Sequence, residues 1–292
     1  MNRQIGPALY IVATPIGNLG DITLRAIETL KQADVVAAED TRVAKRLLGH
    51  HGISARLISC HMHNEKRAAE KILSLLRQGR SVALVTDAGT PLLSDPGAEL
   101  IERVREAGFS VIPVPGPSAL ACALSAAGLK GGRFFFQGFL PAKGSDRTRA
   151  IKMVSSLKVP VILYEAPHRI RRTLKDLIAA MSDRRLFLAR EMTKVHEEYR
   201  WTTLEALAQE MEQHEPRGEF TLIVMPKQEE SDQGQGQEIP DELVSLLKLL
   251  SSPEKTGLKR LSTALARATG QPAASIYNKM VQIRRRQEGQ ER

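Results

Sequence analysis

The chain has 292 residues, of which 42% are apolar and 26% charged, and its formal net charge is +9. These fractions exclude a disordered or fibrous chain, and at roughly 100–200 residues per domain the length predicts two domains with a short appendage. No apolar run reaches the roughly 18 residues of a membrane span, so no membrane partner is expected, and the positive charge favours a polyanionic partner such as nucleic acid.

The first part of the chain alternates short apolar segments with amphipathic helical patterns. We predict strands at residues 9–14, 35–38, 82–86 and 111–114, and helices at 24–32, 43–50, 68–78 and 98–107. A helix from Ser118 to about residue 127 follows, and the glycine-rich stretch 128–132 is a boundary. Such alternation predicts a mostly parallel sheet covered by helices. Residues 1–130 are therefore assigned to an N-terminal α/β domain.

A second α/β domain is predicted over residues 131–226. Its strands are expected at 134–136, 161–164, 186–189 and 220–225, and its helices at 146–157, 171–181 and 204–213. Residues 199–202 form a short strand, which we expect to be antiparallel. The fold class is thus α/β, with two consecutive domains built on mostly parallel or mixed sheets.

A linker and a helical tail complete the chain. Residues 227–239 are a predicted flexible linker, because residues 227–238, KQEESDQGQGQE, include no apolar side chain. Residues 240–292 carry ten basic and five acidic side chains, and residues 261–280 have the pattern of a helix-turn-helix, with Gly270 in the turn and Pro272 before the second helix. A dimerisation hairpin is the alternative, but Arg284, Arg285 and Arg286 favour contact with RNA or DNA.

The two cysteines and the start of the chain indicate the compartment. Cys60 and Cys122 lie far apart and form no C-x-x-C pair, which favours a reducing environment. Residues 1–6 lack the pattern of a signal peptide, so we expect a cytoplasmic protein. His61 and His63 alone do not make a metal site, and no metal is expected.

Four loops that directly follow predicted strands are rich in Gly, Pro and small polar residues. They are TPIGNLGD (14–21), DAGTPLLSDPG (87–97), PGPSA (115–119) and YEAPHR (164–169). Ligands of open α/β sheets bind at the carboxyl ends of strands, so these loops predict one binding site. The chain lacks G-x-x-x-x-G-K-[ST] and G-x-G-x-x-G, which argues against a P-loop enzyme and a dinucleotide-binding fold. The small residues suit a compact, bent ligand with an adenine, a ribose and a short polar chain, and Ser118 is expected to cap its helix.

These loops also carry a family resemblance. The segments TPIGNLGD, AAEDTR, DAGTPLLSDPG, VPGPSA, YEAPHR and REMTKVHEE, in this order, resemble the tetrapyrrole-methylase superfamily, and within it the branch that methylates ribosomal RNA of the small subunit. The resemblance covers residues 8–226, and the tail is similar to that branch's C-terminal helix-turn-helix. It implies an S-adenosylmethionine-dependent enzyme that methylates the 2′-hydroxyl of a cytidine in 16S rRNA of the small ribosomal subunit. It also implies a cofactor folded into a cleft between the two α/β domains, and a homodimer.

The resemblance places the cofactor on the loops. In the superfamily's G-D-P loop, Thr90 here replaces the usual acid while Asp87 lies three residues earlier, so either residue is a candidate contact. Leu93 would line the adenosyl pocket. The cofactor-binding residues implied are Asp87, Ala88, Gly89, Thr90, Leu93, Pro115, Gly116, Ser118, Ala119, Tyr164 and Thr221.

A ribose hydroxyl is a poor nucleophile while protonated, so a base or a hydrogen-bond acceptor should assist the transfer. The candidate catalytic residues are Glu165, Glu39 and Asp40, although Asp40 also fits a helix N-cap. Guanidinium and imidazole groups suit phosphate and ribose oxygens. The predicted RNA contacts are Arg42, His168, Arg169, Arg190, Arg284, Arg285 and Arg286.

Two other functions fit parts of the sequence. A small-molecule methylase acting on a porphyrin-like ring would share the loops, but it would leave the basic tail unexplained. A non-enzymatic RNA-binding protein would use the tail, but it would leave the four loops unexplained. Deleting the tail distinguishes the first alternative, and cofactor affinity distinguishes the second.

Overall fold

In the computed structural model, the first sheet is parallel throughout, with strand order β3-β2-β4-β1-β5. All four residues of β1, β2 and β4 are buried, because helices cover both faces of the sheet. The sequence pattern did not predict β3, in which only Ile58 of the segment RLIS is buried. The strands are β1 (Leu9–Val12), β2 (Val35–Ala38), β3 (Arg56–Ser59), β4 (Val82–Val85) and β5 (Val111–Val114).

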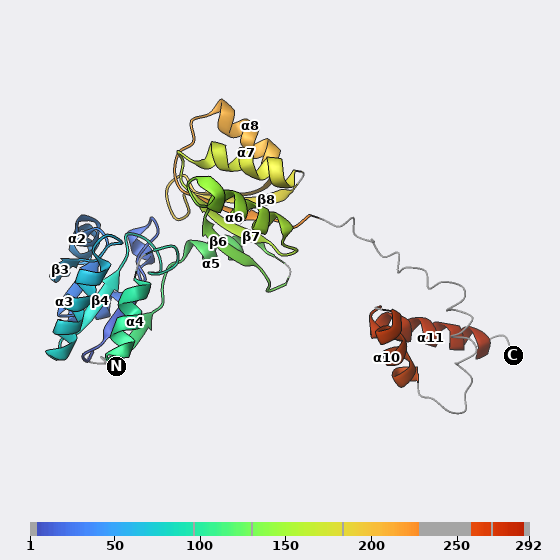
Figure 1. Cartoon of the computed structure of the whole chain (residues 1–292), viewed down its shortest axis with the longest axis horizontal. Helices are drawn as coiled ribbons and strands as arrows, with labels where there is room; N and C mark the ends of the chain where they lie inside the picture. Colours follow the sequence, from blue (N-terminus) through green and yellow to red (C-terminus); the bar gives the residue numbers. More distant parts are fainter. Residues whose placement is uncertain are drawn as a thin grey trace. The chain divides into compact units, whose positions relative to one another are not determined.

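Alternate side chains of these strands point to opposite faces. Tyr10 and Val12 of β1 pack in the cluster that contains Leu30 of the first helix, whereas Leu9 and Ile11 pack in the cluster of the third and fourth helices. The helices of this layer are α1 (Leu24–Gln32), α2 (Thr41–His50), α3 (Glu65–Arg77) and α4 (Ala98–Glu106), with a short 3-10 helix η1 (Leu19–Asp21). Figure 1 shows them around the sheet.

The second sheet is mixed, with strand order β6-β7-β10-β8-β9. Only the β6–β7 pair is parallel, and β9 pairs with β8 in the antiparallel sense that the sequence predicts. The strands are β6 (Phe135–Phe139), β7 (Val161–Glu165), β8 (Arg185–Arg190), β9 (Glu198–Thr203) and β10 (Phe220–Val224). The fold class is therefore α/β, with one parallel and one mixed sheet.

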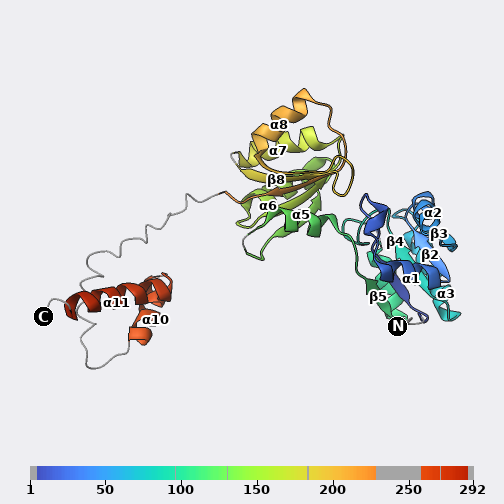
Figure 2. The same cartoon turned by 180° about the vertical axis from the view of Figure 1, so that it is seen from behind.

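Helices cover both faces of the second sheet (Figures 1 and 2). One face packs on α6 (Gly144–Ser156), α7 (Ile170–Met181) and α8 (Leu204–Gln213) through a large apolar cluster. The other face packs on α5 (Ala119–Ala127), where Ala123 meets Ile162 and Ile223 in one cluster. The sequence places α5 in the first domain, whereas in the structure this helix contacts β9 and β10 of the second sheet. The division at residue 130 stays a prediction.

Ser118 does not cap α5 in the way the sequence predicts. It occupies the N-cap position with an extended backbone, but its side chain makes no capping hydrogen bond. In contrast, Asp40 and Thr23 cap their helices by accepting hydrogen bonds from Arg42 N–H and Ala26 N–H. The hydroxyl of Ser118 is thus not used by its own helix.

The structure describes residues 5–95, 97–129, 131–182, 184–227, 258–269 and 271–288. The chain divides into two units, Met1–Lys227 and Gln228–Arg292. In the second unit, α10 (Leu258–Thr269) and α11 (Ala273–Glu288) pack around Ile276 and Met280, as a helix-turn-helix pattern predicts. The predicted linker beyond Lys227, residues 240–257 and the predicted turn residue Gly270 lie outside the described residues. No helix in the described part is long and apolar enough to cross a membrane.

Candidate functional site

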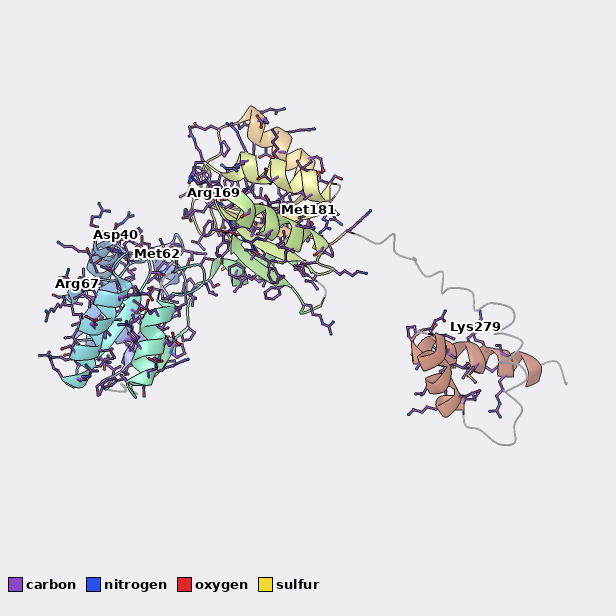
Figure 3. The ribbon with its side chains drawn as sticks, in the orientation of Figure 1. Asp40, Met62, Arg67, Arg169, Met181 and Lys279 are labelled. Atoms are coloured by element: carbon purple, nitrogen blue, oxygen red, sulfur yellow. The ribbon has the colours of Figure 1, made fainter. Side chains whose placement is uncertain are left out.

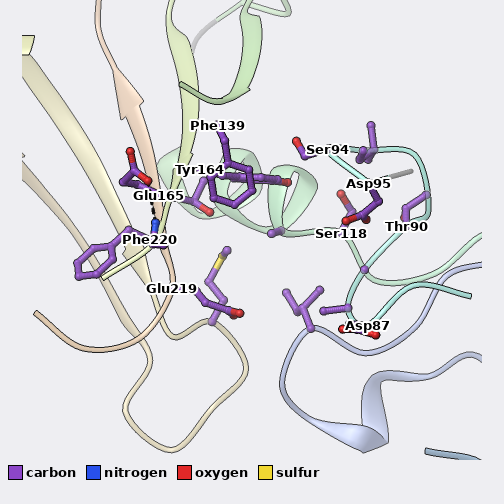
Figure 4. A pocket seen from close by; sticks show the side chains of 18 of the residues that line it. Asp87, Thr90, Ser94, Asp95, Ser118, Phe139, Tyr164, Glu165, Glu219 and Phe220 are labelled. Carbon is purple, nitrogen blue, oxygen red and sulfur yellow. Dashed lines mark hydrogen bonds between the residues drawn. The ribbon is translucent and has the colours of Figure 1, made fainter. Parts of the chain in front are cut away.

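A cavity of about 440 Å³ opens where loops of both sheets meet, a volume typical of small-molecule sites. Figure 4 shows Asp87, Thr90 and Asp95 on one side of it, and Phe139, Tyr164 and Glu219 on the other. The cavity is lined by Ile16, Glu39, Asp87, Ala88, Gly89, Thr90, Leu93, Ser94, Asp95, Ser118, Ala119, Phe139, Tyr164, Glu165, Ala166, Pro167, Met192, Glu219, Phe220 and Thr221.

Most of the residues that the family resemblance implies as cofactor contacts line this cavity. They are Asp87, Ala88, Gly89, Thr90, Leu93, Ser118, Ala119, Tyr164 and Thr221. Pro115 and Gly116 do not line it. The carbonyl of Pro115 accepts a hydrogen bond from Thr23 Oγ1 at 3.3 Å, and a Cβ on Gly116 would lie 3.0 Å from Ala13 Cβ. These two residues support the loop, and their contact with a cofactor stays a prediction.

The loop after β4 is fixed in place by its neighbours. Thr14 and Gly89 exchange backbone hydrogen bonds of 2.8 and 3.0 Å, and Gly89 has a φ of +81° that favours glycine. The hydroxyl of Thr90 donates to the carbonyl of Pro117 at 3.1 Å. The loops after β4 and β5 are thereby joined, and Thr90 uses its hydroxyl for this contact. One carboxylate oxygen of Asp87 accepts a hydrogen bond of 3.0 Å from the backbone N–H of Asp40.

Three carboxylates give the cavity a negative lining. Burial raises the pKa of Asp95 to about 6, and the charges of Glu39 and Asp87 add to this effect. Burial also raises the pKa of Glu39, and the charge of Asp87 raises it further. Both shifts show that the site disfavours more negative charge, so it favours a ligand that carries positive charge.

Two of the three predicted catalytic acids line the cavity, and Asp40 does not. Asp40 lies at the start of α2 (Figure 3), where its carboxylate accepts from Arg42 N–H at 2.8 Å. Hydrogen bonds from Arg42 lower the pKa of Asp40 to about 2, which makes it a weak base. The helix-cap interpretation therefore accounts for Asp40.

Glu165 has a fully buried carboxylate with both oxygens in use. One oxygen accepts from Thr173 Oγ1 at 2.6 Å, and the other accepts from Ala166 N–H at 2.9 Å and lies 3.2 Å from Arg169 Nε. Arg147 extends this network by donating to Thr173 Oγ1 at 2.9 Å. These contacts favour a positioning role for Glu165, and its role as a base stays a prediction.

The side chains predicted to contact RNA differ in whether they already make hydrogen bonds and ion pairs within the protein. Arg169 (Figure 3) pairs with Glu165 and donates to the carbonyl of Leu140. Arg190 donates to the carbonyl of Arg217 at 2.9 Å and lies 3.6 Å from Glu198.

Other predicted contacts are more accessible. Arg42 is 90% exposed beside Asp40, and His168 and Arg285 are exposed. Arg284 is also exposed and has a partner of its own, whereas the side chain of Arg286 lies outside the described residues. RNA binding by all seven residues stays a prediction.

Several lining residues were not singled out from the sequence. Ser94 and Asp95 lie inside the loop DAGTPLLSDPG after β4, so the sequence motif that predicts the site already contains both residues. Phe139, Met192 and Glu219 lie just at or beyond strands of the second sheet. Met192 lies within the quoted segment REMTKVHEE, whereas the only sequence signal for Phe139 and Glu219 was their position next to a strand end. Among the described residues, no group of three or more His, Cys, Asp and Glu side chains is placed to hold a metal ion.

The chain matches known proteins over most of its length. Residues 8–208 match the family model of the Tetrapyrrole (Corrin/Porphyrin) Methylases. A relative from Neisseria meningitidis serogroup B, named Ribosomal RNA small subunit methyltransferase I, is 42% identical over 94% of this chain and 93% of its own length. A relative of the same name from Escherichia coli O157:H7 is 43% identical over 92% of this chain and 93% of its own.

Two solved structures share the fold at 21% identity. A cobalt precorrin-4 methyltransferase matches 74% of this chain and 94% of its own, with a TM-score of 0.58. The uroporphyrin-III-C-methyltransferase from Thermus thermophilus matches 74% and 93%, with a TM-score of 0.53. Together with the family model and the closely related sequences, these findings show that the chain belongs to the tetrapyrrole methylase family and is a methyltransferase whose methyl donor is S-adenosylmethionine.

Proposed function

We propose that this chain acts in the cytoplasm and transfers a methyl group from S-adenosylmethionine to the ribose 2′-hydroxyl of a cytidine in 16S rRNA of the small ribosomal subunit. RNA is supported as the substrate by how much of this chain each group of similar proteins matches. The relatives named for small-subunit ribosomal RNA match 92–94% of this chain, whereas the porphyrin-type and corrin-type enzymes match 74% of it and nearly all of their own length. This chain therefore has residues without a counterpart in those enzymes.

The cavity fits S-adenosylmethionine in volume and in charge. Its volume of about 440 Å³ lies within the usual range for small-molecule sites. Glu39, Asp87 and Asp95 line the cavity and would attract the positive sulfonium and ammonium groups. The backbone around Gly89 carries no side chain, so a ligand can approach it closely.

Methyl transfer requires the nucleophile, the carbon and the sulfur in line, and orientation can supply roughly 7–11 kcal/mol of the barrier. The loops after β4 and β5 would hold the donor, and the second sheet would present the ribose. Glu39 lines the cavity, and burial raises its pKa, so its carboxylate is a stronger base than an exposed glutamate. The phenol of Tyr164, whose pKa burial raises to about 12, stays protonated at neutral pH and therefore does not serve as the base.

The experiment incubates the purified chain and S-adenosylmethionine with small subunits that lack the modification, followed by nuclease digestion and mass mapping. We expect one methyl group on a cytidine ribose. A methyl group on a base, or no methyl group on RNA, would reject the proposal. A chain ending at Lys227 should keep its cofactor affinity and lose RNA methylation, whereas a small-molecule methylase would keep its turnover.

We also propose a homodimer. Tyr199 and Trp201 on the edge strand β9 are 39% and 38% exposed, which leaves aromatic surface available to a second copy. Light scattering on the eluting protein should give twice the chain mass of 32.2 kDa. A mass of one chain at micromolar concentration would contradict the dimer.

A further inference from the structure

Phe139 ends β6 at the cavity, and its side chain remains open to solvent. The residue is 45% exposed and lines the cavity beside Tyr164, with ring centroids 5.8 Å apart and planes at 67° (Figure 4). An exposed aromatic ring at the rim of a site is available to a flat ligand group. Two further observations show that the chain holds this ring in place.

A β-bulge turns Phe139 toward the cavity. In a regular strand Phe136 and Phe139 would point to opposite faces, because side chains alternate. Here the register with β7 shifts between Phe136 and Gly138, so that Phe136 pairs with Ile162 and Phe139 pairs with Tyr164. Both phenylalanine rings therefore lie on one face, and both meet Tyr164 edge-on. Bulges of this kind re-aim a side chain and are frequent beside active sites.

Gly138 at the bulge also leaves room for the loop that follows β4 of the first sheet. It has a φ of +67°, and a Cβ there would lie 2.6 Å from Ser94 Oγ. Ser94 belongs to the loop after β4 that lines the cavity. The bulge thus sits where the two sheets meet, directly beside the exposed ring.

Two arginines, the buried Arg147 and the half-buried Arg169, fix the backbone that follows the ring. Arg169 donates to the carbonyl of Leu140, and Arg147 donates to the carbonyl of Pro141 at 3.0 Å. The carboxylate of Glu165 pairs with Arg169, and Thr173 connects Glu165 to Arg147. This network has no free oxygen on Glu165 for chemistry, but it makes the end of β6 rigid. A rigid backbone pre-organises the ring for binding.

We propose that the ring of Phe139 is the stacking platform for the base of the nucleotide whose ribose is methylated. This inference rests on the proposed function. Proteins that recognise a single nucleotide in RNA commonly take its base out of the stack, and aromatic side chains receive the freed base. Phe139 is then a positioning residue that holds the nucleotide while its ribose faces the methyl donor.

The test compares Phe139→Leu, Phe139→Tyr and Phe139→Trp in the full chain. Leucine keeps apolar bulk but removes the aromatic face, while tyrosine and tryptophan keep it. Phe134→Leu is the matched control, because Phe134 is 41% exposed just before the same strand and does not line the cavity. Each variant is measured for its KM and kcat with unmethylated small subunits, its Kd for S-adenosylmethionine and its melting temperature.

We expect Phe139→Leu to raise the KM for small subunits about tenfold or more, in line with the usual contribution of base stacking. The Kd for S-adenosylmethionine should change less than about twofold, and the aromatic variants and Phe134→Leu should stay near the wild type. An unchanged KM in Phe139→Leu would overturn the inference. A loss confined to S-adenosylmethionine affinity would also overturn it, because it would make Phe139 a cofactor contact. An equal loss in the aromatic variants would overturn it as well.

The wild-type chain separates this inference from the proposed function. If wild type places no methyl group on RNA ribose, the proposed function fails and the inference fails with it. If wild type methylates the ribose and Phe139→Leu has the same KM, the inference alone fails.

Discussion

The backbone N–H of Asn18 donates a hydrogen bond of 3.0 Å to the side-chain oxygen of Thr193. This bond joins the loop after β1 of the first sheet to the loop after β8 of the second. Thr193 has a φ of +66°, a left-handed conformation that costs a non-glycine residue free energy. Their neighbours Ile16 and Met192 line the cavity and share one apolar cluster. The contact therefore holds together two loops whose residues Ile16 and Met192 line the cavity.

Gly17 leaves the space that this contact needs, so Gly17→Ala should weaken cofactor binding. The added Cβ would lie 2.8 Å from Thr193 Oγ1 and 2.7 Å from Lys194 Cγ, and the two loops would have to separate. We expect the Kd for S-adenosylmethionine to rise about tenfold, equivalent to roughly 1.4 kcal/mol of overpacking. Calorimetric titration measures it. Gly6→Ala is the control, since no atom lies within 4 Å of its Cβ. Equal affinities in both variants would show that the contact does not shape the site.

Asp95 should make the chain's stability depend on pH. Its pKa is about 6 in the folded chain, against an ordinary value of 3.8 for an aspartate. The folded chain binds the proton more tightly, so the contribution of Asp95 to the free energy of unfolding falls as pH rises from about 4 to 6 and stays constant above that. Asp95→Asn should lack this slope and be more stable than wild type at pH 7. Urea denaturation across this pH range tests it, and an unchanged slope in the variant would contradict it.

Glu165→Gln should lower stability, because it removes the charge that Arg169 pairs with inside the protein. We expect a loss of about 1–3 kcal/mol in the free energy of unfolding, the usual cost of leaving a buried polar group unsatisfied. The measurement is urea denaturation together with kcat. Unchanged stability with a kcat loss of several orders of magnitude would instead identify Glu165 as the base.

Glu39→Gln should give the opposite result to Glu165→Gln, namely a loss of activity without a loss of stability. Its charge is repelled by Asp87, so neutralising it should leave stability unchanged or higher. If its carboxylate accepts the proton of the ribose hydroxyl, kcat should fall by about 10²–10⁴-fold while the Kd for S-adenosylmethionine changes little. Single-turnover methylation of small subunits measures this step. A kcat within threefold of wild type would exclude Glu39 as the base.

The sequence predicted the elements whose residues are buried uniformly. In β1, β2 and β4 every residue is buried, so each reads as a continuous apolar run bounded by polar or glycine residues. The strand β3 has one buried residue of four, and its segment RLIS carries no such run. Burial on both faces therefore decides whether a short strand can be recognised.

The candidate site was predictable in part on both sides, because the family resemblance implied Tyr164 and Thr221 of the second sheet, which line the cavity. Loops that directly follow buried strands, such as the one containing Gly89, identified the side built by the first sheet. Phe139 was missed because a bulge reverses the alternation from which its face would be inferred. Met192 was missed because it reaches the cavity through the docking of two sheets, which depends on contacts far apart in the chain. The roles of Glu165 and Asp40 depend on hydrogen-bond partners that sequence spacing does not reveal.

The proposed methyl transfer requires that the cavity between the two sheets binds a sulfonium donor. Calorimetry on the full chain tests this binding most directly. We predict that S-adenosylmethionine binds at one site per chain. Asp95→Asn should weaken the binding of S-adenosylmethionine more than that of its product S-adenosylhomocysteine, because only the donor has a positively charged sulfur for the Asp95 carboxylate to attract. Binding of neither compound to the wild-type chain would contradict the account.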